Sequence, residues 1–154
     1  MESIVFKVGE QVTYSLSELS QTKTINPIFI EIDHNKKTKT IEFSNGLLPI
    51  TIPKAISKLE ESTALAAAII IPVEIKENNS LYTAILAVIH NFDDDYDVTI
   101  SIKYSFKENN LKIGKYELIE YNNILDEKLK SIENEFVKGL LTPKIASNIW
   151  LLGA

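Results

Sequence analysis

The sequence predicts an α+β domain built on a mainly antiparallel sheet or sandwich of about eight strands, with helices added to it. Three observations carry this prediction. Residues 98–106 alternate between apolar and polar side chains, two long apolar runs precede them, and short polar segments separate the runs. Alternation marks a strand with one face in the core, and polar breaks between such runs are typical of turns. With 154 residues we expect one domain spanning 1–154.

The strand at 98–106 has the clearest pattern. Its apolar face carries Val98, Ile100, Ile102, Tyr104 and Phe106. The residues between them are Thr99, Ser101, Lys103 and Ser105, which are polar. A shift by one residue would turn every side chain to the opposite face, so we expect a firm pairing register.

The apolar runs before it are less clear. Residues 65–71 are apolar throughout, and periodicity alone does not separate a buried strand from a buried helix. Branching at Cβ in Ile69, Ile70 and Ile71 favours a strand, whereas the alanines favour a helix, so residues 64–68 stay open between the two. Pro72 lacks a backbone donor and indicates a bulge, an edge or a helix end. Residues 81–89 predict a second strand covered on both faces.

The N-terminal third predicts shorter strands. Residues 4–8 and 12–16 alternate around Gly9, which predicts two strands joined by a turn, and the polar segment 17–26 predicts a loop or one helical turn. A hairpin is expected from 27–32 and 38–43.

The next segment predicts a short strand and a short helix. Residues 47–52 predict the strand, interrupted by Pro49. Residues 53–62 predict the mid-chain helix, with Pro53 at its first position.

The segment 123–152 predicts the C-terminal helix, packed on the sheet. It follows a strand at 111–121 whose phase shifts at Gly114, which indicates a β-bulge. We expect a cap at Asn123 and an end at Gly139. The apolar stripe consists of Leu125, Leu129, Ile132, Phe136 and Leu140, at steps of four and three. A last apolar segment then starts at Thr142 and Pro143.

Composition excludes several classes of function. The chain has no cysteine, which excludes disulfides, thiolate metal sites and cysteine nucleophiles. All 16 basic residues are lysine and the net charge is −5, so we expect no nucleic-acid partner. No apolar stretch reaches the roughly 18 residues needed to span a bilayer, and no secretory signal is seen. We therefore expect a cytoplasmic protein without a membrane partner.

No motif for catalysis or cofactor binding is present, so we expect no enzyme, cofactor or metal site. The acidic turn at Asp93, Asp94, Asp95 and Asp97 offers oxygen ligands for calcium, but it lacks the glycine and glutamate of a calcium loop. A solvated hairpin turn is the favoured interpretation. His90 would form an acid–base dyad with Asp93 or Asp95, although a locally bonded rim histidine is favoured.

Two further segments are candidates for interaction. The turn with Lys36, Lys37 and Lys39 would suit an acidic lipid surface or an acidic partner, and a charged turn that keeps the sheet edge soluble is the favoured interpretation. The apolar C-terminal segment would dock either on a neighbouring subunit or on its own sheet, and both stay open. Its candidate residues are Ile145, Ile149, Trp150, Leu151 and Leu152.

Three classes of function remain. The first is a non-enzymatic structural, assembly or protein-interaction subunit that contacts other copies or another protein through sheet edges and the apolar C-terminus. The second is a small-ligand or lipid-binding domain with a cavity under the C-terminal helix. The third is a membrane-active protein in which residues 64–92 rearrange, and it ranks last because these strands lack lipid-facing alternation.

Overall fold

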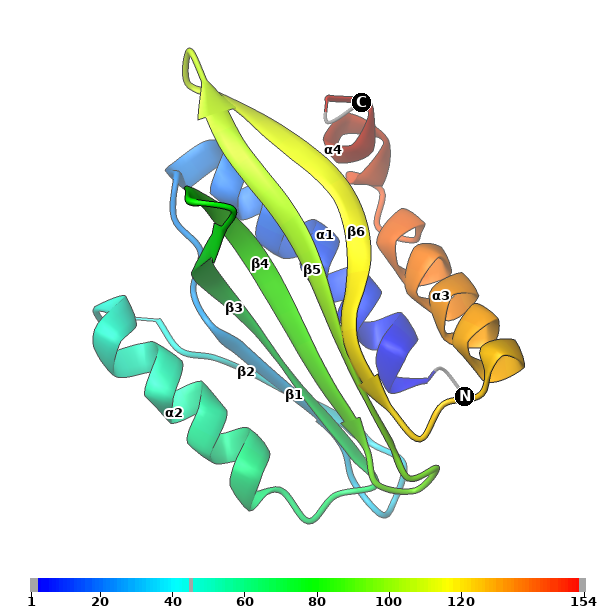
Figure 1. Cartoon of the computed structure of the whole chain (residues 1–154). Helices are drawn as coiled ribbons and strands as arrows, with labels where there is room; N and C mark the ends of the chain where they lie inside the picture. The colour runs from blue at the N-terminus through cyan, green and yellow to red at the C-terminus, as the bar shows by residue number, and fades with distance from the viewer. Residues whose placement is uncertain (1–2, 45, 153–154) are drawn as a thin grey trace.

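One antiparallel sheet forms the centre of the fold in the computed structural model, which describes residues 3–44 and 46–152 (Figure 1). Within these residues the sheet has six strands, in the order β2-β1-β3-β4-β5-β6, and it is a single sheet where about eight strands or a sandwich were expected. The strands are β1 Ile28–Ile32, β2 Thr38–Glu42, β3 Ala66–Glu77, β4 Ser80–Asn91, β5 Tyr96–Lys107 and β6 Asn110–Asn122. The helices are α1 Ile4–Thr22, α2 Leu48–Glu61, α3 Asp126–Leu141 and α4 Ala146–Leu152.

The four long strands from β3 to β6 form the predicted series of hairpins. In the register of β4 and β5, Ile85 lies opposite Ile102 and Ile89 opposite Val98, so the predicted apolar face points into the core from Val98 to Ile102. Farther along the strand Tyr104 is partly buried and Phe106 is exposed, and Ser101, which was predicted to face water, is buried. The segment 64–68, which the sequence left open, is strand from Ala66 onward. Branched side chains in a sheet that is covered on both faces therefore outweigh the helix propensity of the alanines.

The N-terminal strands predicted at 4–8 and 12–16 are wrong, because both segments belong to the single helix α1. This helix also includes most of the predicted loop and ends at Thr22, before the capping residue Lys23, whose φ of 65° is left-handed. Its fully buried side chains include Ile4, Val8, Val12, Leu16 and Leu19. These residues recur at steps of three and four, so they form one apolar stripe that packs against the sheet.

The strand predicted at 47–52 is also wrong. Helix α2 already begins at Leu48, so the helix predicted at 53–62 exists but starts earlier. Pro49 lies in the first helical turn, where a missing backbone N–H removes no intrahelical hydrogen bond. Helix α2 buries Ala55 and Leu59 against the second face of the sheet.

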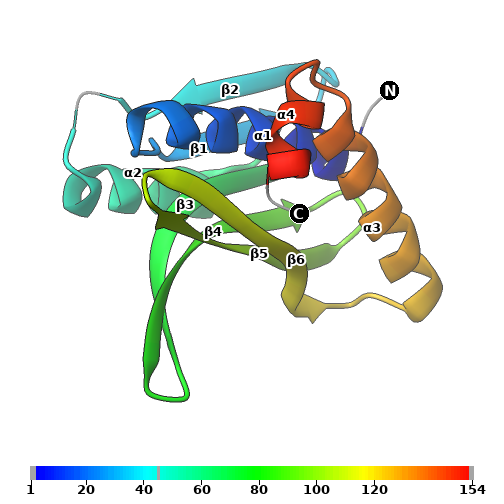
Figure 2. The same cartoon turned by 90° about the horizontal axis from the view of Figure 1, so that it is seen from above.

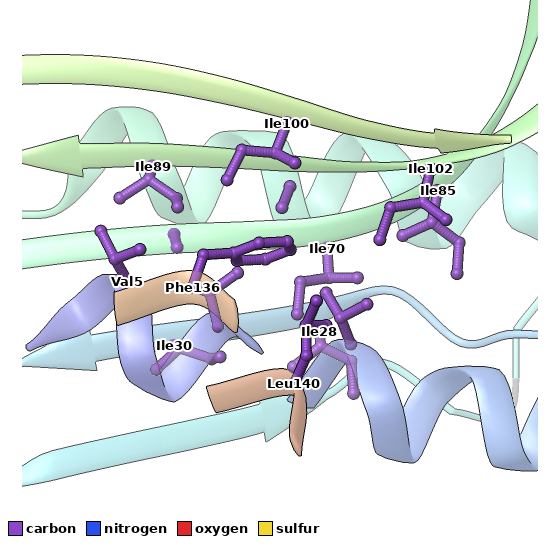
Figure 3. Close-up of a cluster of buried hydrophobic side chains, with 14 of the residues drawn as sticks. Val5, Ile28, Ile30, Ile70, Ile85, Ile89, Ile100, Ile102, Phe136 and Leu140 are labelled. Carbon is purple, nitrogen blue, oxygen red and sulfur yellow. The ribbon is translucent and has the colours of Figure 1, made fainter. Parts of the chain in front are cut away.

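The two faces of the sheet have different coverings. Figure 1 shows α1 behind the strands and α2 in front of them. Side chains from α1 and α3 meet the first face, and Figure 3 shows Phe136 and Leu140 beside Ile70 and Ile100 in this core. The second core lies under α2 and includes Phe29 and Ile69. Strands β1 and β3 are therefore covered on both faces.

The C-terminal helices lie at the β6 side of the sheet. Figure 2 shows α3 beside α1 and α4 close to both. The helix stripe predicted for α3 is confirmed at Ile132, Phe136 and Leu140, which are buried, but Leu125 is 81% exposed and precedes the helix. The expected cap at Asn123 and the expected end at Gly139 are wrong, since α3 begins after Leu125 and continues to Leu141.

Candidate functional site

Strand β6 ends the sheet, so only one of its sides pairs with another strand in the part of the chain that the structure describes. Its pairing with β5 is irregular at two points. Tyr116 lies opposite Ile102 and Ile113 opposite Tyr104, which leaves one extra residue in β6 and confirms the bulge predicted at Gly114. A second extra residue, Ile119, lies between the partners of Thr99 and Ile100. Bulges are common on edge strands, where they twist the edge.

Helix α3 packs mainly on α1 and is displaced from β6. The ring of Phe136 reaches the ring of Tyr116 edge-to-face, with 5.4 Å between centroids. Beyond this contact, β6 and the two C-terminal helices enclose a groove of about 750 Å³, which we call the β6 groove. It is lined by Ile113, Gly114, Lys115 and Tyr116 of β6, by Glu133, Val137, Leu140 and Leu141 of α3, and by Trp150 of α4.

A buried threonine fixes the α4 side of this groove. The Thr13 hydroxyl of α1 donates a hydrogen bond to the Leu140 carbonyl at 2.7 Å and accepts one from the Trp150 indole N–H at 3.2 Å. Thr13 is completely buried and Ile149 is 5% exposed. The C-terminal segment therefore docks on its own chain at Ile149 and Trp150, and the indole becomes part of the groove lining.

The remaining residues predicted in this segment differ in their placement. Ile145 is partly buried just before α4. The side chains of Leu151 and Leu152 lie outside the described residues. Contact of this segment with another copy remains a prediction.

The groove is mostly apolar. Its polar side chains are the Tyr116 phenol and the charged groups of Lys115 and Glu133. Burial raises the pKa of the Tyr116 phenol, and the Glu133 carboxylate raises it further. The phenol therefore stays neutral at physiological pH and can donate one hydrogen bond. Leu141 is 59% exposed and Val137 is partly exposed, so the α3 wall presents apolar surface to whatever enters the groove.

The acidic turn lies between β4 and β5, as a hairpin turn. The Asp94 backbone N–H donates to the Asn91 side chain at 2.9 Å, and the Asp94 carboxylate forms an ion pair with Lys128 of α3 at 3.4 Å. Asp95 has a left-handed φ of 53°, and Asp93, like Asp97 at the start of β5, is exposed. Across residues 3–44 and 46–152, no three His, Cys, Asp or Glu side chains form a group that could hold a metal ion.

His90 lies near the end of β4, away from the β6 groove. Its Nε2 lies 3.9 Å from an oxygen of Asp97, its neighbour on β5, and its ring meets Phe92 edge-to-face. The partner is thus Asp97 rather than Asp93 or Asp95. Both side chains are partly exposed, and the geometry matches the rim histidine that the sequence favoured.

The basic turn lies at the opposite edge of the sheet from β6. One Asp33 carboxylate oxygen accepts from the backbone N–H groups of Asn35 and Lys37, at 2.8 and 3.0 Å, and this bonding shapes the turn. Lys36 takes a left-handed φ of 63°. Together with Lys37 and Lys39 it is exposed to solvent.

A second hollow of about 570 Å³ lies at the start of α2. Leu48 and Pro49 line one side of it, and Val73 and Tyr104 line the other. Its lining includes one acidic residue, Glu74. Unlike the β6 groove, it brings together none of the segments that the sequence singled out for interaction.

The β6 groove unites two of those segments, the sheet edge and the apolar C-terminus. Its residues Tyr116, Glu133 and Val137 were not predicted, because they come from separate elements and share no motif. Among the helices that the structure describes, none has both the length and the apolar character needed to cross a membrane. Comparison with protein-family models, with curated proteins and with solved structures finds no match.

Proposed function

We propose that this protein is a non-enzymatic interaction subunit that holds an extended protein segment in the β6 groove, paired with the outer edge of β6. One observation carries the proposal: the terminal strand of the sheet borders an apolar groove of about 750 Å³ whose far wall is helical. An added strand would take the position next to β6 and pack under α3.

The chemistry of both walls fits an extended chain. The outer side of an edge strand presents backbone N–H and C=O groups that a further strand can pair with. Side chains of that strand point alternately to the two faces of the sheet, so every second one would enter the groove. There it would meet Val137, Leu141 and the Trp150 indole.

Trp150 makes the proposal directly testable, because it is the single tryptophan of the chain and lines the groove. Peptides of about twelve residues with apolar side chains at alternate positions are titrated into dilute protein, and the indole emission is followed. We expect a saturable change for a subset of peptides. Leu141→Asp should abolish it, because it places a charge on the apolar wall.

Leu125→Asp is the matched control, since Leu125 is an even more exposed leucine directly before the start of α3, far from the groove end of the helix. It should bind peptides as the wild type does. If no peptide changes the emission, or if Leu141→Asp binds as tightly as the control, the proposed function is wrong.

A second candidate is a small apolar ligand in the same groove. Its volume of about 750 Å³ lies within the range of small-molecule sites, about 300–1,000 Å³, and the Tyr116 phenol offers one polar contact. Amide hydrogen exchange separates the two candidates. An added strand slows exchange along the outer side of β6, whereas a small ligand changes Trp150 emission and leaves that exchange unaltered.

A further inference from the structure

We propose that the segment added to β6 is β6 of a second copy, so that two sheets join antiparallel through a two-fold axis at Tyr116. This inference rests on the proposed function and names its partner. The observation behind it is the order of the charged residues along β6. Neither the groove nor the fold requires that order.

The charges of β6 are arranged antisymmetrically. Lys112 and Lys115 precede Tyr116, and Glu117 and Glu120 follow it. All four charged side chains are exposed. One half of the strand is therefore basic and the other acidic, with the tyrosine between them.

Antiparallel pairing about Tyr116 matches these halves. Residues whose numbers add to twice 116 lie opposite each other, which places Lys115 opposite Glu117 of the second copy and Lys112 opposite Glu120 of the second copy. The two-fold axis repeats both pairs. The interface is isologous and contains four opposite-charge pairs across its seam.

Lys112, Glu117 and Glu120 share one face of the sheet, whereas Lys115 lies in the first bulge and lines the β6 groove. Directly opposed residues in an antiparallel pair point to the same side of the sheet. Lys112, Glu117 and Glu120 lie opposite Ser105, Ser101 and Thr99 of β5. Those β5 residues all belong to the polar set of the strand, on the face away from α1. One bulge lies on each side of Tyr116, and both copies have the same bulges. Lys112 of one copy and Glu120 of the other are therefore equally far from the two-fold axis.

Other registers bring like charges together. A two-fold axis between Leu118 and Ile119 would place Glu117 opposite Glu120 of the second copy. An axis between Ile113 and Gly114 would place Lys112 opposite Lys115 of the second copy. Like charges directly opposed across strands are destabilising, so the charge pattern selects the register centred on Tyr116.

The test uses two charge-reversed variants of the full chain. Lys112→Glu/Lys115→Glu makes β6 wholly acidic, and Glu117→Lys/Glu120→Lys makes it wholly basic. Sedimentation velocity is recorded over a dilution series for the wild type, for each variant and for their equimolar mixture. Each variant alone should show a dimer dissociation constant raised by about 100-fold or more, because four attractive pairs become repulsive. The mixture should form a heterodimer at least as tight as the wild-type dimer.

The substituted side chains are exposed, so the variants should retain the circular-dichroism spectrum of the wild type, which serves as the folding control. A wild type that is monomeric at every concentration overturns the second-copy proposal. Peptide-induced changes in Trp150 emission would then still support the proposed function. A wild-type dimer that both variants reproduce unaltered, with no preference for the mixture, also overturns it and places the interface elsewhere.

Discussion

Gly9 of α1 and Gly139 of α3 lie against each other where the two helices cross. A Cβ atom built on Gly9 would lie 3.0 Å from the Gly139 Cα and 2.9 Å from the Leu140 nitrogen. A Cβ built on Gly139 would lie 3.1 Å from the Glu10 nitrogen and would overlap the Phe6 carbonyl oxygen. The two backbones therefore touch, and no side chain larger than hydrogen fits at either position.

Gly9→Ala and Gly139→Ala should each destabilise the protein. In an exposed helix this change would add about 1 kcal/mol of stability through helix propensity. Here the methyl group meets backbone atoms, which forces the helices apart at an overpacking cost of about 1–3 kcal/mol or more. We expect a net loss of up to about 2 kcal/mol, read as a lower midpoint of denaturant unfolding.

Gln21→Ala, at an exposed position of α1, is the control for the glycine substitutions and should change stability by less than about 0.5 kcal/mol. Alanine variants as stable as the wild type would show that the two helices can separate without loss.

Thr13→Val should loosen the α4 side of the β6 groove. The Leu140 carbonyl belongs to the last turn of α3, where carbonyl groups lack intrahelical partners, so the threonine hydroxyl caps it. Valine has the same shape without the hydroxyl and leaves both the carbonyl and the Trp150 N–H without this partner, at a cost of about 1–3 kcal/mol. The emission of Trp150 should shift as well.

Thr22→Val tests the same change at an exposed site of the same helix, where water replaces the hydroxyl contacts. Its stability should stay within about 0.5 kcal/mol of the wild type. Equal effects of the two substitutions on unfolding and on Trp150 emission would argue against the capping role of Thr13.

Glu108→Asn should stabilise the β5–β6 hairpin. Its turn residues Glu108 and Asn109 have left-handed φ values of 54° and 68°, nearly the same as the 50° and 65° of Asn78 and Asn79 in the β3–β4 turn. Asparagine tolerates this conformation better than glutamate does. We expect a gain of about 0.5–1 kcal/mol in denaturant unfolding, and Asn78→Glu should lose a similar amount. A loss on Glu108→Asn would refute this explanation.

Alkaline pH should destabilise the fold in part through Tyr96. Burial raises the pKa of this phenol above its ordinary value, outweighing the opposing effects of Asn91 and Lys128. The unfolded chain therefore ionises first as pH rises past about 10. The stability contributed by the neutral phenol is complete below that pH and is lost as pH climbs through the higher folded pKa.

Tyr96→Phe removes the ionisable group and should weaken the fall in unfolding free energy above about pH 10. Tyr14→Phe, at a half-exposed position, is the control. An unchanged slope for Tyr96→Phe would show that other groups dominate alkaline unfolding.

The hairpins from β3 to β6 were predictable because their signals are local. Alternation fixes which face is buried, and turn residues such as Asn78 and Asn79 mark where each strand ends. Helix α1 was not predictable in the same way. Its buried residues Ile4, Val8 and Val12 are spaced by four, a step that fits the period of a strand and, nearly, the period of a helix.

The β6 groove depends on information that no local pattern carries. Gly9 was interpreted as a turn and Gly139 as a helix end, since nothing near either residue indicates the other. Their contact draws α3 towards α1, and the displacement of α3 from β6 leaves the groove between Tyr116 and Val137.

The crossing of α1 and α3 also has a consequence for the order of folding. The hydrogen bond from Thr13 to Leu140 closes a separation of 127 residues, whereas β3 to β6 are joined by consecutive short turns. Short loops close at little entropic cost, so the four-stranded meander should form early, and the long-range helix pair should form last. During synthesis the apolar face of the sheet stays uncovered by α3 until that helix has left the ribosome. Chaperone contact in this interval should therefore map to the face of β4 and β5 that α1 and α3 later bury.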